Sequence, residues 1–236
     1  MKSLILTMFA ILMGATLMAQ QASYTDPVIA YQRILLEKSG QGSYRKIGTF
    51  KVIGSPYFWG GEVRGDIFTA KEKGVDVFVD YDTYYQQLEV HNSKQSEKMN
   101  MSLKDVDSFF LYIRDETGNK KQFFFINATF LDKGKKMFIQ ELFKGEKCSL
   151  YKGYKSTLGY VSTNYVESEL RQFDLETEYF YYSQATSGKL KKLKLSDKAL
   201  IAEFKDIRDI TDLVKSGDLE KNPETTLLTI FAAINQ

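Results

Sequence analysis

The sequence predicts an α+β protein in which antiparallel β-sheets come first along the chain and helices come last. Aromatic residues form 14% of the chain and occur with β-branched residues in short runs, as is typical of strands. Between residues 46 and 195 these runs are separated by glycine-containing turns. After residue 195 the hydrophobic period changes from about two to about 3.6 residues, which indicates helices. The sheets are expected to be sandwich-like or to form a partly closed barrel.

The first 19 residues have the pattern of a cleavable secretory signal peptide. Lys2 supplies the positive start, and an uncharged run from Leu4 to Met18 precedes an expected cleavage point at Ala19. Polar Gln20 ends this run before the ~20 apolar residues that a membrane-spanning helix needs, so no transmembrane segment is expected after cleavage. The sequence thus predicts an exported protein that is periplasmic, outer-membrane-associated or released, with one β-rich domain at 20–236.

Charge and cysteine content restrict the partners. The 32 basic and 30 acidic side chains nearly balance, so no global field would attract nucleic acid. Cys148 is the one cysteine of the chain, which excludes an internal disulfide. We expect it to be a half-buried structural thiol. The sequence leaves the oligomeric state open.

The first elements follow from capping and alternation. Asp26 and Pro27 have the pattern of a helix start, and a short helix is predicted at 27–38, ended by Gly40. Strands are then predicted at 47–53, 61–69, 75–81 and 85–90, followed by a polar loop at 91–100.

Three hairpins follow. The first joins 106–113 to 122–127 through a turn whose Gly118-Asn119 pair suits positive φ. The second joins 137–143 to 148–151, and the third joins 179–183 to 190–195. The last of these runs carries alternating lysines, which are typical of the solvated face of an edge strand: Lys189, Lys191, Lys192 and Lys194.

Two or three helices form the C-terminal tail at 196–236. Ser196 is a capping residue before an apolar run that ends at Phe204. A second helical segment places apolar residues on one face up to Gly217. Asn222 and Pro223 begin a last helix.

Several segments resemble a group of uncharacterised exported proteins from Bacteroidota. The similar segments are Gly54-Ser55-Pro56-Tyr57-Phe58, Gly65-Asp66-Ile67-Phe68-Thr69, residues 77–90, Val106-Asp107-Ser108-Phe109, and the lysine-rich run with the helices after it. The resemblance covers most of the mature chain and implies an exported envelope protein. It carries no activity. Trp59-Gly60-Gly61 departs from the pattern of that group, which has acidic or polar residues there.

No catalytic, cofactor or metal site is predicted. His91 is the one histidine, and we expect it to be an exposed side chain at a strand end. The sequence has no G-x-x-x-x-G-K-[ST], H-E-x-x-H, C-x-x-C or G-x-S-x-G motif. Asp76, Asp80 and Asp82 lack the spacing and glycine of a calcium loop, so an exposed acidic strand face is expected.

The loop Tyr57-Phe58-Trp59 is the predicted partner-binding site. Three consecutive aromatics beside two glycines can stack on sugars or anchor a protein partner. The competing interpretation is that Tyr57 and Phe58 plug the end of the sheet. The sequence therefore favours a non-catalytic envelope protein that binds an envelope protein or a glycan. A hydrolase using two carboxylates and a structural component of an outer-membrane complex are the alternatives.

Overall fold

The chain was analysed as a computed structural model, which describes residues 52–59, 63–92, 97–114, 117–160, 171–183, 186 and 188–236. The predicted signal peptide and the predicted helix at 27–38 lie outside these residues. The described residues fall into two units: Val52, Ile53, Tyr160, Arg171 and Gln172 belong to the first, and the described residues of Gly54–Gly159 and Phe173–Gln236 belong to the second. The expectation of one domain at 20–236 stays a prediction.

In the first unit, the described residues include strand β1 (Val52–Ile53) and the start of β10 (Arg171–Ser183). These two segments pair in parallel, with Val52 opposite Arg171. All other contacts described below lie within the second unit.

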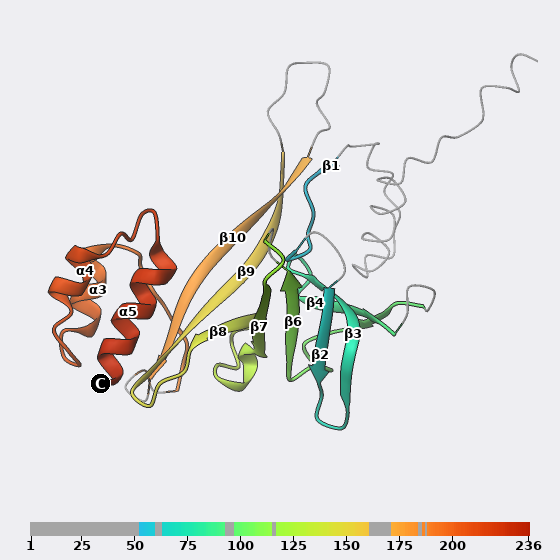
Figure 1. Ribbon diagram of the computed structural model, residues 1–236, viewed down its shortest axis with the longest axis horizontal. Coiled ribbons are helices and arrows are strands. Elements are labelled where there is room, and N and C mark those ends of the chain that lie inside the picture. The colour runs from blue at the N-terminus through green and yellow to red at the C-terminus, as the bar shows by residue number, and fades with distance from the viewer. Residues whose placement is uncertain are drawn as a thin grey trace, which may run out of the picture. The chain divides into compact units, whose positions relative to one another are not determined.

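The described strands form an eleven-stranded, mostly antiparallel open sheet with three α-helices after it (Figure 1). The β-rich, α+β prediction is therefore confirmed at this level, whereas neither a sandwich nor a closed barrel is shown. The path through the sheet is β1-β10-β9-β8-β7-β6-β2-β3-β4-β5, and β11 pairs with β10 beside it. The bounds not yet given are β2 (Val63–Phe68), β3 (Lys73–Asp82), β4 (Gln87–His91), β5 (Met99–Met101), β6 (Ser108–Arg114), β7 (Lys120–Asn127), the short 3₁₀ helix η2 (Ala128–Phe130), β8 (Phe138–Phe143), β9 (Cys148–Tyr160) and β11 (Lys191–Lys192).

All three predicted hairpins are confirmed. The turn between β6 and β7 contains Gly118 at φ 84°, the left-handed conformation that glycine adopts without a steric cost. The hairpins β8-β9 and β10-β11 pair as expected. β11 pairs with β10 alone among the described strands, and its lysines are exposed, as an edge strand requires.

In the β2-β3-β6-β7 region, the alternation of side chains along each strand determines which residues face the core. In β6, Phe109, Leu111 and Ile113 are buried, while the intervening side chains are only partly covered. They join the largest aromatic core with side chains from β2, β3, β4, β7, β8 and β9.

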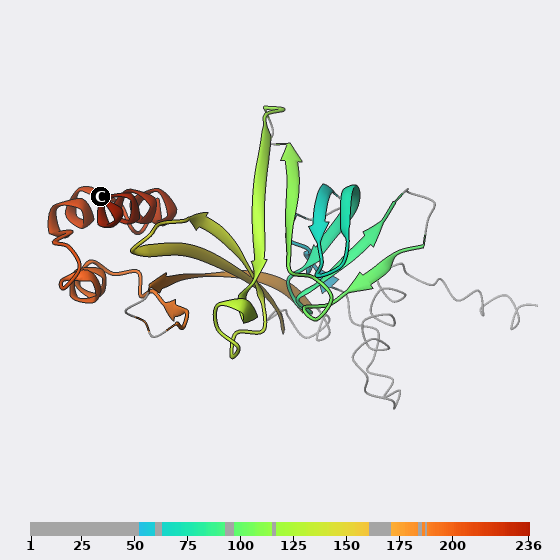
Figure 2. The same ribbon diagram turned by 90° about the horizontal axis from the view of Figure 1, so that it is seen from below.

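The helices α3 (Asp197–Phe204), α4 (Thr211–Ser216) and α5 (Pro223–Asn235) begin and end close to the predicted positions. Phe204, Ile230 and Phe231 are fully buried and belong to a second core made with β9, β10 and Leu193. Lys152 on β9 also binds Glu224 on α5 at 2.7 Å. These contacts attach the helical tail to one end of the sheet, beside β9 and β10 (Figures 1 and 2).

Candidate functional site

The predicted site residues lie in a loop that is fixed to the end of β3. The Phe58 backbone N–H donates to the carbonyl oxygen of Tyr81 at 2.9 Å, and Tyr57 forms an isolated antiparallel bridge with Asp82. The Pro56 carbonyl oxygen accepts from both the backbone N–H and the hydroxyl of Thr83, at 2.9 and 2.7 Å. Backbone hydrogen bonds thus hold the loop in one conformation at three consecutive residues.

A second link attaches the same place to β9. The hydroxyl oxygens of Thr83 and Ser156 lie 2.7 Å apart, and the Ser156 backbone N–H donates to the Thr83 carbonyl at 3.2 Å. Both side chains are buried, so this link is shielded from water. Thr83 therefore joins the loop on one side to β9 on the other.

Phe58 belongs to the aromatic core. Its ring centroid lies 4.7 Å from that of Tyr154, 5.3 Å from Phe125 and 5.5 Å from Phe123, each in an edge-to-face arrangement. Aromatic pairs at these distances favour this geometry. The interpretation that Phe58 plugs the sheet end agrees with these contacts.

Trp59 differs from Phe58 because half of it, 50%, is exposed to solvent. Its ring centroid lies 6.5 Å from that of Phe58 at 43°. The indole therefore lies beside a ring that is packed in the core, and half of Trp59 remains accessible to solvent. The structure separates the three candidates: Tyr57 and Phe58 are partly buried, and Trp59 is exposed.

Tyr84 is a further exposed aromatic near this loop in the chain path, since it follows Thr83 directly. Its side chain is 38% exposed, and it also packs against neighbouring rings. Its ring contacts Tyr85 at 4.9 Å and Phe173 at 5.6 Å. Exposure at a turn cannot be read from alternation, because the turn residues 83–86 interrupt the strand period.

The expectation of an exposed His91 is wrong. His91 is 5% exposed and stacks on Phe78, the residue opposite it on β3, with ring centroids 4.9 Å apart at 13°. The pairing of β3 with β4 produces this contact between residues that are 13 positions apart in the sequence. The sequence near His91 therefore gave no signal for the contact.

The expected exposed acidic face is correct only for Asp76. Asp80 and Asp82 are buried, and Asp82 accepts from the backbone N–H groups of Tyr84 and Tyr85. Asp80 lies opposite Glu89, and Lys98 contacts both carboxylates, at 3.0 and 3.7 Å. The single lysine offsets part of the charge of the two carboxylates, as in a structural ion pair. Within the described ranges, no group of three or more His, Cys, Asp or Glu side chains could hold a metal ion.

Cys148 is fully buried in the core beneath the helices, where half-burial was expected. Burial raises the pKa of its thiol. A neutral thiol is a weak nucleophile, so the surroundings of Cys148 are those of a structural residue.

Comparison with known proteins adds no assignment, since no family model, curated protein or solved structure matches the chain. In the part of the chain that the structure describes, no helix has both the length and the apolar character needed to cross a membrane.

Proposed function

We propose that this protein is an exported, non-catalytic binding protein of the cell envelope that contacts a protein or glycan partner through Trp59. One observation carries the proposal: Trp59 is half exposed on a loop whose backbone is hydrogen-bonded to β3. A large aromatic surface on a fixed backbone loses little conformational entropy on binding.

The base of the site supports this role. Phe58 contacts four core aromatics, and the Thr83 link to Ser156 holds β9 against the same turn. We also propose that these hydrogen bonds between the turn after β3 and β9 partly close the sheet at this place. A partly closed sheet would keep the loop rigid while Trp59 remains accessible.

An affinity pull-down from the native envelope, read by mass spectrometry, tests the proposal together with a carbohydrate array. We expect wild-type protein to retain one envelope protein or one glycan class, and Trp59→Ala to lose it. Phe130→Ala is the matched control, because Phe130 is an exposed aromatic on η2 and 65% accessible. Equal capture by all three proteins would show that Trp59 does not form the binding surface.

A further inference from the structure

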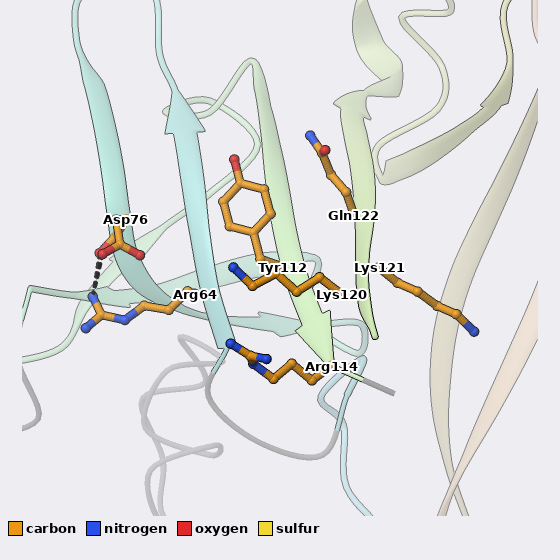
Figure 3. Close-up of a pocket in the computed structure, with 7 residues that line it drawn as sticks. All are labelled: Arg64, Asp76, Tyr112, Arg114, Lys120, Lys121 and Gln122. Carbon is orange, nitrogen blue, oxygen red and sulfur yellow. Dashed lines mark hydrogen bonds and ion pairs between the residues drawn. The ribbon is translucent and has the colours of Figure 1, made fainter. Parts of the chain in front are cut away.

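A second surface, on β2, β6 and β7, has the features of a ligand site and is independent of the Trp59 loop. Arg64, Tyr112 and Gln122 lie opposite one another across the three strands, and Arg114 lies opposite Lys120. A surface pocket of about 500 Å³ opens here, within the size range of small-molecule sites. Its lining residues are Arg64, Asp76, Tyr112, Arg114, Lys120, Lys121 and Gln122 (Figure 3).

The pocket places like charges in direct opposition. Arg114 and Lys120 are cross-strand partners in register, and like charges in this position destabilise a sheet. Figure 3 shows the Arg114 side chain extending from the end of β6, and the Lys120 side chain crossing β6, both toward β2. Among the described residues, no carboxylate forms an ion pair with either of them. The lining carries four cations and one carboxylate, so a bound anion would remove an unfavourable repulsion.

Arg64, the third cation, is held in place by its surroundings. Its guanidinium lies 3.8 Å from the ring centroid of Phe78 and 3.6 Å from the Asp76 carboxylate. Asp76 has φ 53°, a conformation that costs energy for a residue other than glycine, and its backbone N–H donates to Asp66 at 2.9 Å. The β2-β3 register shifts at this point. The contacts with Phe78 and Asp76 hold the Arg64 guanidinium beside the pocket.

The uncharged lining residues narrow the class of anion. The Tyr112 ring is nearly parallel to that of Phe110, at 3° and 6.4 Å, so a flat aromatic surface continues from the pocket along β6. Burial and a hydrogen bond with Asp66 raise the pKa of Tyr112, which keeps its hydroxyl protonated. The Gln122 amide both donates and accepts hydrogen bonds. Aromatic faces suit the C–H side of a pyranose ring, and guanidinium groups suit a carboxylate.

We propose that this pocket binds an acidic saccharide, with the sugar carboxylate at Arg114, Lys120 and Arg64 and the sugar ring against Tyr112. A phosphate group satisfies the same cations but makes no use of the aromatic surface. The affinity for a neutral sugar and for inorganic phosphate therefore distinguishes the proposal from its alternatives.

Isothermal titration calorimetry with trigalacturonate, neutral galactotriose and inorganic phosphate tests the site. Trigalacturonate is expected to bind wild-type protein at low salt and more weakly at 0.5 M NaCl, because salt screens exposed charges. The double variant Arg114→Gln/Lys120→Gln is expected to bind at least about tenfold more weakly, since charge-assisted hydrogen bonds are lost. Its melting temperature should not fall, because the variant removes a repulsion.

Lys133→Gln is the matched control. It removes a positive charge of the same kind from an exposed residue that does not line the pocket. Lys133→Gln and Trp59→Ala should both keep wild-type affinity for trigalacturonate. The proposal is overturned if wild-type protein binds none of the three probes, if phosphate or galactotriose binds as tightly as trigalacturonate, or if the double variant binds like wild type.

Discussion

Phe58 and Trp59 are neighbours in one loop, and substituting each by alanine should lower the stability of the protein by different amounts. Phe58→Ala removes a ring that contacts Tyr154, Phe125 and Phe123 at centroid distances of 4.7 to 5.5 Å. Core Phe→Ala substitutions cost about 3–5 kcal/mol, and we expect about 3 kcal/mol because Phe58 is only partly buried. For a chain of this size, that is a fall in melting temperature of roughly 6–12 °C.

Trp59→Ala should cost no more than about 1 kcal/mol, or roughly 2–4 °C, because half of the indole is already exposed. Differential scanning calorimetry is the appropriate assay, since Trp59 is the one tryptophan and its removal abolishes the tryptophan fluorescence signal. An equal fall for both variants would show that Trp59 is a core residue, and the proposed binding role of the loop would then be refuted.

Three further outcomes are expected. Burial raises the pKa of Glu203, but hydrogen bonds from Lys191 and Tyr181 outweigh it and hold this pKa below its usual value. The stability that Glu203 contributes is therefore present at neutral pH and is lost as the pH falls through the folded-state pKa. Glu203→Gln should lower the melting temperature at pH 7, and the melting temperature of this variant should fall less than that of wild type when the pH is then lowered. The Cys148 thiol, 1% exposed, should react with a thiol reagent only after unfolding, and rapid labelling of the native protein would contradict its placement. Gly65→Ala should destabilise by about 3 kcal/mol in chemical denaturation, because its Cβ would overlap the Phe110 carbonyl oxygen, whereas Gly118→Ala, with open space around it, should cost about 1 kcal/mol.

The elements that depend on local signals were predictable. Gly118 at positive φ fixes the β6-β7 turn, and Pro223 occupies the first turn of α5. The long strands β9 and β10 were predicted too short, ending at Tyr151 and beginning at Tyr179. Lys152 lies inside β9, and α5 supplies Glu224 as its partner from 72 residues away. That contact makes a strand interior acceptable for a charged side chain.

The candidate sites, like the fold, have some features that local sequence predicts and others that depend on contacts between distant residues. The aromatic loop at 57–59 was visible as a pattern, but the difference between Phe58 and Trp59 depends on the position of β7 and β9. The β2-β6-β7 pocket had no sequence signal, because Arg64 and Arg114 are 50 positions apart in the sequence. The like-charge opposition of Arg114 and Lys120 requires the hairpin register, which the turn length alone leaves open.

The link between Thr83 and Ser156 has a consequence for how the protein folds. Most neighbouring strands of the described sheet are joined by short connections and can pair early, whereas this hydroxyl contact closes a loop of 73 residues. Closing a loop of this length has an entropic cost before any contact compensates for it. The β3-β9 contact should therefore form late during folding and open first in native-state hydrogen exchange, so that the Ser156 amide exchanges faster than amides in the β6-β7 hairpin.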